Sequence, residues 1–158
     1  MPGRRSFLGW LAAGASAGGL AACSSAEART YPVRFSDAEG KKRRTAKQYY
    51  ILRRKGTEVP GSSPLLHEKR KGGVVCAADG NVLYSSATKY DSKTGWPSFW
   101  DVVPGSIGTS VDFDVGYPRT EVHCARCGGH LGHVFNDGPK PTGKRYCMNG
   151  DALLFRPA

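Results

Sequence analysis

The chain has 158 residues, with 23 Lys and Arg against 13 Asp and Glu, a formal net charge of +10 and 39% hydrophobic residues. This length suits one compact domain, and the apolar content excludes a wholly disordered chain. The 21 Gly and 10 Pro argue against a helical bundle and favour many turns between short elements. No apolar stretch reaches the length of an ordinary membrane-spanning helix.

Residues 1–22 have the layout of an export signal. Arg4 and Arg5 precede an uncharged stretch of small residues, and Arg4-Arg5-Ser6-Phe7-Leu8 resembles the twin-arginine consensus. Leu20-Ala21-Ala22-Cys23 resembles a lipobox, in which the cysteine carries the lipid. We therefore expect export to the periplasmic side of the cell envelope and a membrane anchor through lipid on Cys23. The alternative is an ordinary cleaved signal with a chance cysteine.

Residues 23–43 show little periodicity, and we expect a tether there, followed by the folded domain over residues 44–158. Thr45 and Gln48 have the spacing of a capping box, which predicts a helix over 45–55. Gly56 suits the left-handed position that ends such a helix.

From Gly72 onward the pattern consists of short apolar runs separated by turn residues. Asp79-Gly80-Asn81 is a tight-turn sequence between two such runs. Val111, Phe113 and Val115 alternate with polar residues, which is the period of a half-buried strand. The predicted strands are 74–76, 82–84, 110–115, 121–124, 132–135, 145–149 and 152–156. The fold class is therefore mainly β and mostly antiparallel, with one or two N-terminal helices.

Basic clusters occur at residues 41–44, 53–55 and 69–71. Nucleic-acid binding is one interpretation of such clusters. An exported chain meets anionic lipid more often than DNA, however, and most runs of charge are solvated surfaces. We expect no nucleic-acid partner and at most a weak attraction to anionic membranes.

Four further cysteines follow Cys23. Cys124 and Cys127 form a C-x-x-C knuckle, a spacing that lets two thiolates reach one tetrahedral ion. The partner pair would be Cys76 and Asp79, in which a carboxylate replaces the fourth thiol. These four residues could hold a structural zinc ion. Because exported proteins favour disulfides, a metal-free chain with Cys124 bonded to Cys127, or with Cys76 bonded to either, stays open.

Cys147 is the remaining thiol. On a strand, Arg145 and Asn149 would share its face, and the cation would favour the thiolate. His130 and His133 lie upstream, and two histidines close to an unpaired cysteine favour nucleophilic chemistry. The alternative is an inert Cys147 buried in a β core.

Several longer motifs resemble the type-B methionine sulfoxide reductases, the MsrB family. They are Gly56-Thr57-Glu58-Val59-Pro60, Gly95-Trp96-Pro97-Ser98-Phe99, the run Cys124–Phe135 and the run Asp137–Asn149. The likeness covers about residues 44–156. It implies two antiparallel β-sheets with short N-terminal helices. It also implies thiol-dependent reduction of methionine-R-sulfoxide in oxidised polypeptides, with the free amino acid as a further candidate substrate.

The resemblance also implies a role for each matching residue. Cys147 would attack the sulfoxide sulfur and become a sulfenic acid. His130, His133 and Asn149 would orient and protonate the S–O group, with Arg145 beside the thiol. The substrate methyl group would lie against Trp96 and Phe135. No organic cofactor is implied.

One departure from the family pattern concerns the regeneration of Cys147. Many members carry a resolving cysteine just before the Gly-Trp-Pro-Ser-Phe motif, where this chain has Thr94. We expect an external thiol, supplied by a thioredoxin-fold protein of the cell envelope, with Cys76 or Cys124 as the alternative. We further expect a monomer that repairs oxidised envelope proteins.

Two rival functions use the knuckle cysteines instead. A zinc-knuckle binding module would leave Cys147 inert, and a thiol–disulfide oxidoreductase would use Cys124 and Cys127 as its redox couple. Neither accounts for Arg145-x-Cys147-x-Asn149 beside the histidine pair.

Overall fold

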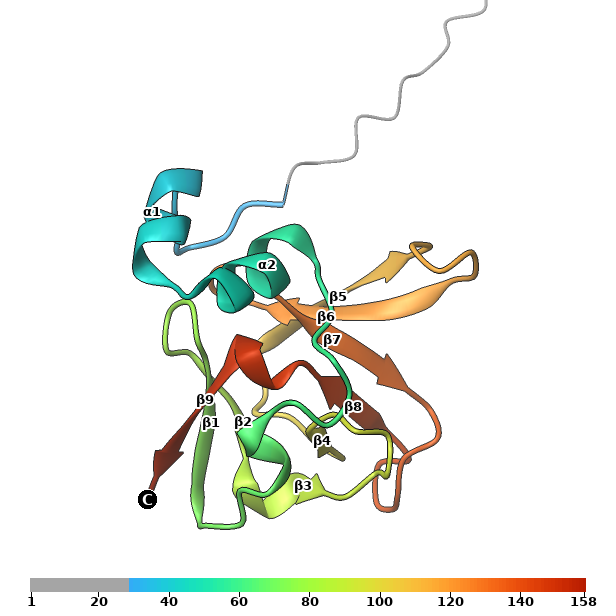
Figure 1. The fold of residues 1–158 in the computed structure, drawn as a ribbon. Helices are drawn as coiled ribbons and strands as arrows, with labels where there is room; N and C mark the ends of the chain where they lie inside the picture. Colours follow the sequence, from blue (N-terminus) through green and yellow to red (C-terminus); the bar gives the residue numbers. More distant parts are fainter. Residues whose placement is uncertain (1–28) are drawn as a thin grey trace, which may run out of the picture.

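The structure is a computed structural model that describes residues 29–158 (Figure 1). The predicted export signal and Cys23 lie outside the described residues. Within residues 29–158, no helix has both the length and the apolar character needed to cross a membrane.

Two short helices precede nine strands that form two antiparallel sheets. The helices are α1 (Asp37–Arg43) and α2 (Ala46–Arg54). The strands are β1 (Gly72–Cys76), β2 (Val82–Ser85), β3 (Lys89–Tyr90), β4 (Ser98–Phe99), β5 (Ile107–Asp112), β6 (Arg119–Cys124), β7 (His130–Phe135), β8 (Arg145–Met148) and β9 (Leu153–Pro157). The strand orders are β2-β1-β9 and β3-β4-β8-β7-β6-β5. The predicted mainly β fold class is confirmed.

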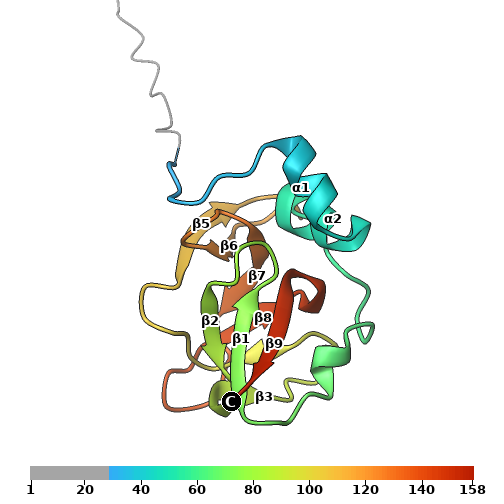
Figure 2. The ribbon, with the colours of Figure 1, turned by 90° about the vertical axis from the view of Figure 1, so that its left-hand side faces the viewer.

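The core lies between the two sheets, with the three-stranded sheet in front of the larger one in Figure 2. The Tyr84 ring from β2 stacks on Phe99 from β4, with ring centroids 4.2 Å apart. Its hydroxyl donates to Met148 Sδ of β8 over 2.9 Å, which satisfies the one polar atom of a fully buried ring. Aromatic packing of this kind fixes the larger sheet from its inner face and leaves the other face free to carry a site.

The helix predicted over 45–55 is present as α2, and its capping box is formed by Thr45 and Gln48. Its end differs from the prediction, because Lys55 and not Gly56 takes the left-handed conformation, with φ 55°. Gly56 serves another purpose. A Cβ at this position would come within 2.1 Å of the Tyr50 ring, so only glycine lets that ring pack over the chain.

The segment expected to be a tether is ordered where the structure describes it. Ser36 and Glu39 form a second capping box, which starts α1. Upstream of this helix, the Val33 N–H donates to the Arg126 carbonyl over 2.9 Å, and Phe35 packs against the core beneath the Arg44 guanidinium. The sequence does not reveal this helix by periodicity because it has only seven residues.

The expectation for residues 110–115 was wrong about which side chains are buried. Val111 and Phe113 are 64% and 65% exposed, whereas Asp112 between them is buried. The strand β5 ends at Asp112, whose carboxylate accepts hydrogen bonds from Arg119 and pairs with His133. A carboxylate can be buried where such partners satisfy it.

Candidate functional site

One row of polar side chains crosses the larger sheet. Residues directly opposite one another in neighbouring strands lie on the same face. The strand register aligns the members of the row in the order Ser110, Glu121, His133, Cys147 and Ser98. Val122, Leu131 and Met148, on the same strands, are fully buried in the core instead. The sheet therefore has an apolar inner face and a polar outer face.

A cavity of about 130 Å³ opens on this outer face beside Cys147. Five of the site residues predicted from the sequence line it, namely Trp96, His133, Phe135, Cys147 and Asn149. Three further residues line it: Thr57, Arg119 and Gly132. The structure thus brings together residues from the coil after α2, the loop before β4, and strands β6, β7 and β8.

Cys147 is half-buried, whereas the other three cysteines of the described residues are buried. Its Sγ lies 3.8 Å from the Thr94 hydroxyl. That hydroxyl continues through Ser92 to Ser98 by hydrogen bonds of 2.8 and 2.7 Å. The thiol therefore faces polar neighbours and a cavity open to solvent, which is inconsistent with an inert cysteine in a β core.

His133 is held against the cavity by a carboxylate. Its Nε2 hydrogen-bonds Asp112, and Arg119 donates to the same carboxylate over 3.1 Å. Burial lowers the pKa of His133, while the bond to Asp112 acts in the opposite direction. Burial alone would raise the pKa of Asp112, but the bonds from His133 and Arg119 outweigh it and keep that pKa low. Asp112 is therefore an anion that orients the imidazole.

His130 lies behind His133, with ring centroids 5.5 Å apart, and does not line the cavity. Its Nδ1 hydrogen-bonds Glu121 over 2.8 Å, and Glu121 also accepts from Lys55 and Ser110 over 2.8 and 2.7 Å. Burial opposes ionisation of Glu121, yet these bonds hold its pKa well below the usual range. Each histidine thus has its own carboxylate.

Asn149 and Trp96 are connected through the backbone of Glu58. The Glu58 N–H donates to Asn149 Oδ1 over 3.0 Å, and its carbonyl accepts from Trp96 Nε1 over 3.3 Å. Asn149 Nδ2 donates in turn to the Leu131 carbonyl. Asn149 follows the end of β8 at Met148, but it still shares the cavity with Cys147, as the predicted alternation required.

Arg145 lies at the edge of the site and does not line the cavity. Its guanidinium makes two hydrogen bonds of 2.8 Å to Asp137, which raise the pKa of Arg145, and lies 4.3 Å from the Phe135 ring centroid. The positive charge of Arg145 is therefore paired with the Asp137 carboxylate. The clearest geometric effect of Arg145 is to hold the Phe135 ring at the cavity wall.

Sequence reasoning missed the carboxylates behind the histidines and part of the cavity wall. The signal for Asp112, Arg119 and Glu121 was the alternation of polar residues on two adjacent strands, but the apolar residues between them dominated the interpretation. Gly132 had a different signal within the motif. A Cβ there would come within 2.2 Å of the Cys147 carbonyl oxygen, so glycine permits the close approach of β7 and β8.

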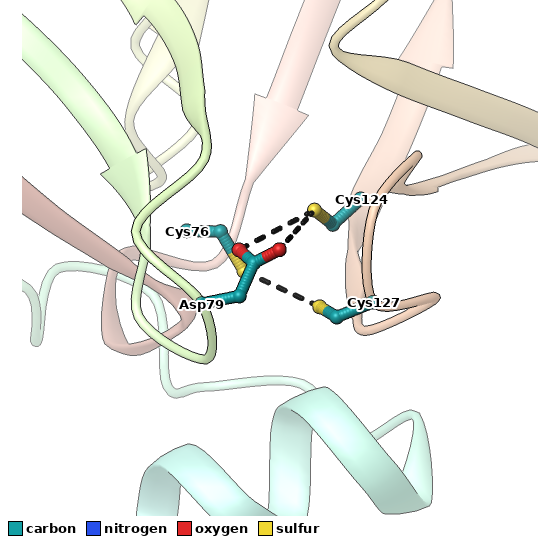
Figure 3. A group of neighbouring side chains, drawn as sticks. All are labelled: Cys76, Asp79, Cys124 and Cys127. Carbon is teal, nitrogen blue, oxygen red and sulfur yellow. Dashed lines mark hydrogen bonds between the residues drawn. The ribbon is translucent and has the colours of Figure 1, made fainter. Parts of the chain in front are cut away.

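A second cluster contains the four residues predicted as metal ligands, drawn in Figure 3. One ligand atom from each of Cys76, Asp79, Cys124 and Cys127 lies within 4.8 Å of all the others. The sulfurs of Cys76 and Cys127 are 3.7 Å apart, and Cys124 Sγ is 3.7 Å from both Asp79 oxygens. Tetrahedral zinc–sulfur bonds of about 2.3 Å place sulfurs about 3.8 Å apart. The geometry fits a metal ion and is compatible with zinc.

Titratable and charged groups lie close together in and around this cluster. The Cys76 thiol interacts with Cys124 and Cys127, which raises the pKa of Cys76 and lowers that of Cys124, so one thiolate forms at the expense of its neighbours. Arg126 lies 3.6 Å from Asp79, and Arg44 donates to the carbonyl of Ala78 in the same loop. All three thiols are free, and the 3.7 Å between the sulfurs of Cys76 and Cys127 is far too long for a disulfide.

Comparison with known proteins gives a consistent result over most of the chain. The family model of the SelR domain matches residues 44–157. The chain is 53% identical over 127 residues to a peptide methionine sulfoxide reductase MsrB of Leptospira interrogans, which covers 80% of this chain and 97% of the relative. It is 52% identical over 125 residues to the MsrB of Methanosarcina barkeri, covering 78% and 88%. Against the mitochondrial methionine-R-sulfoxide reductase B3 of Mus musculus, it is 44% identical over 141 residues, covering 89% and 56%.

Proposed function

This chain belongs to the MsrB family, which carries the SelR domain, and we propose that it reduces methionine-R-sulfoxide in oxidised polypeptides to methionine. The observation that carries this proposal is the half-buried Cys147 next to His133 in a cavity walled by Trp96 and Phe135. This arrangement offers a nucleophile, a proton donor and an apolar recess within the space of one side chain.

In the proposed reaction the Cys147 thiolate attacks the sulfoxide sulfur. This attack forms a bond between the two sulfurs, and the oxygen takes a proton. The S–O bond of the substrate then breaks as the hydroxyl group passes to the cysteine sulfur, and the sulfur–sulfur bond breaks to release methionine, which leaves a sulfenic acid on Cys147. Two electrons pass from the cysteine sulfur to the methionine sulfur, so the protein is oxidised once in each cycle. Asn149, fixed by Glu58 and Leu131, is placed to orient the oxygen.

His133 is the proposed proton donor because it opposes Cys147 in the strand register. Burial disfavours its charged form, and Asp112 restores part of its proton affinity, which suits a group that must give up a proton near neutral pH. His130 has no place in the cavity lining. We assign it the support of His133, with its own orientation fixed by Glu121.

Stereoselectivity follows from the two kinds of wall. Trp96 and Phe135 favour the methyl group, whereas His133 and Asn149 favour the oxygen. With these two substituents fixed, only one epimer presents its sulfur to Cys147.

Turnover of the separated R and S epimers of dabsyl-methionine sulfoxide with dithiothreitol tests the proposal. Wild type should reduce the R epimer alone, and Cys147→Ser should reduce neither. Comparable turnover of both epimers, or full activity in the variant, would overturn the assignment.

We propose that an external thiol from a thioredoxin-fold protein regenerates Cys147. Cys76 and Cys124 are buried in the metal cluster, which argues against either as a displaced resolving cysteine. The Thr94 hydroxyl, by contrast, is 3.8 Å from the reactive sulfur. Thr94→Cys should therefore lose two thiols for each methionine formed, as a disulfide with Cys147, whereas wild type should lose one. Loss of two thiols by wild type, counted after a single turnover, would contradict this view, because it would show a resolving cysteine within the chain.

We also propose that the ion held by Cys76, Asp79, Cys124 and Cys127 is a structural zinc. Four protein ligands leave no open position for substrate, so zinc would contribute to stability alone. It would join the β1–β2 turn to the knuckle before β7, and none of its four ligands lines the catalytic cavity.

The cellular setting is the remaining part of the proposal. The motifs around Arg4 and Cys23 support export to the periplasmic side and a lipid anchor, where a monomer would repair oxidised envelope proteins. Cys23→Ser should move the protein from the membrane fraction to the soluble fraction. Retention of the variant in the membrane fraction would contradict the lipid anchor.

A further inference from the structure

The catalytic cavity accepts little more than one side chain. Its volume of about 130 Å³ is well below the roughly 300–1,000 Å³ of ordinary ligand pockets. The remainder of a polypeptide substrate must therefore lie outside the cavity, across its rim.

A second hollow, of about 200 Å³, adjoins the first. Thr57 lines both cavities. The apolar surface of the second hollow comes from Tyr50 and Ile51 of α2 and from Val59 in the coil. Tyr50 and Val59 are 54% and 71% exposed, so both side chains are accessible to a bound polypeptide.

The coil at Glu58 separates the two hollows and is hydrogen-bonded to its neighbours on both sides. The Glu58 carboxylate accepts the Gly150 and Asp151 N–H groups over 2.7 and 2.9 Å, while its backbone binds Asn149 and Trp96. Glu58 therefore connects the second hollow to residues of the catalytic cavity. Its carboxylate is the only buried one that lines the second hollow, and it is already hydrogen-bonded.

The Tyr50 ring packs over the same coil. It lies against Gly56, where a Cβ would come within 2.1 Å of the ring, and the Gly56 N–H donates to the Tyr50 backbone carbonyl over 3.1 Å. The run Gly56–Val59 thus has three tasks: it seats Tyr50, holds the catalytic frame through Glu58, and places Val59 at the rim. The catalytic reaction itself accounts for only the second of these.

We infer that the second hollow, defined by Tyr50, Ile51, Thr57 and Val59, binds an apolar side chain two positions from the methionine sulfoxide of a polypeptide substrate. In an extended chain, alternate side chains point the same way, about 7 Å apart, so one chain can fill two hollows separated by a single wall. Methionine normally lies among apolar residues, and its oxidation disrupts that packing and exposes its neighbours. This inference rests on the proposed function and names the substrate feature that it recognises.

The test compares peptides that carry methionine-R-sulfoxide in a glycine background with peptides that have leucine two positions before or after it. Wild type should show a kcat/KM about 5- to 10-fold higher for one of the leucine peptides than for the glycine peptide. Tyr50→Ala and Val59→Ser should each bring this ratio close to one. Val82→Ser, which changes an exposed valine on the smaller sheet, serves as the matched control and should keep the wild-type ratio.

The outcomes separate this inference from the proposed function. If wild type reduces no sulfoxide at all, the proposed function fails. If wild type reduces every peptide with the same kcat/KM, or if both variants keep the leucine preference, the second hollow has no part in binding. The inference is also overturned if a variant lowers kcat/KM for the glycine peptide and for the leucine peptide by the same factor.

Discussion

The two cysteine regions of this molecule differ in what surrounds the sulfur. Cys147 is a single half-buried thiol at a cavity, with the Thr94 hydroxyl of a loop beside it and the His133 imidazole on the neighbouring strand. Cys76, Cys124 and Cys127 are buried together beside a carboxylate and have only one another as sulfur neighbours. A cysteine side chain can thus serve as a nucleophile or as a metal ligand, and its access to solvent decides between the two roles.

The largest expected effect comes from exchanging one sulfur in each region. Cys147→Ser should lower kcat/KM for methionine-R-sulfoxide by at least about 10³-fold, because a serine hydroxyl is a much poorer nucleophile at neutral pH. Its thermal stability should stay near that of wild type. Cys124→Ser should show the reverse pattern. The kcat of its folded fraction should stay within about threefold of the wild-type value, and its Tm should be at least about 10 °C lower than that of wild type. If Cys124→Ser abolished turnover in fully folded protein, the division between the two regions would be wrong.

Asp79 allows a finer test of the ligand region. Asp79→Asn removes the anionic ligand but keeps its shape, so zinc retention should fall by about 10- to 100-fold. Asp79→Cys should increase it, because sulfur is the softer ligand. Competition with a chromophoric chelator measures both, with Asp91→Asn, an exposed aspartate elsewhere, as the control. Equal retention in all four proteins would exclude Asp79 from the site.

The effect of Asp112→Asn should be smaller and should depend on pH. Burial lowers the pKa of His133 and Asp112 raises it, so loss of the carboxylate should lower that pKa further. Less of the imidazole is then protonated at pH 7, and kcat/KM should fall about 10-fold, with partial recovery at lower pH. Asp114→Asn serves as the control. This residue lies in an exposed turn two positions after Asp112, and its substitution should leave the pH profile unchanged. A profile in Asp112→Asn that coincides with wild type would remove the carboxylate from the account.

Much of the fold follows from short-range patterns. The capping box at Thr45 predicted α2, and Asp79-Gly80-Asn81 predicted the β1–β2 hairpin, because turn and cap chemistry act over a few residues. The helix α1 has a local signal of the same kind, the capping box of Ser36 and Glu39, but its seven residues are too few to show a periodicity. The burial of Asp112 could not be predicted from short-range patterns, because it depends on Arg119 and His133 on other strands.

The candidate site shows the same division. Cys147, Asn149 and Trp96 belong to runs that the family resemblance covers, and the structure places all three at one cavity. Thr57 also belongs to such a run, but only the path of the coil after α2 brings it to the cavity. Arg119 lies in none of these runs and joins the cavity through the sheet register, so the three-dimensional arrangement is needed to find it.

A single-turnover experiment without reductant tests the central claim most directly. Reduced protein mixed with excess methionine-R-sulfoxide peptide should release one methionine per chain, and a sulfenic-acid probe should label Cys147 alone when the products are examined by mass spectrometry. Label on a knuckle cysteine in place of Cys147, or release of methionine without any labelled cysteine, would contradict the account.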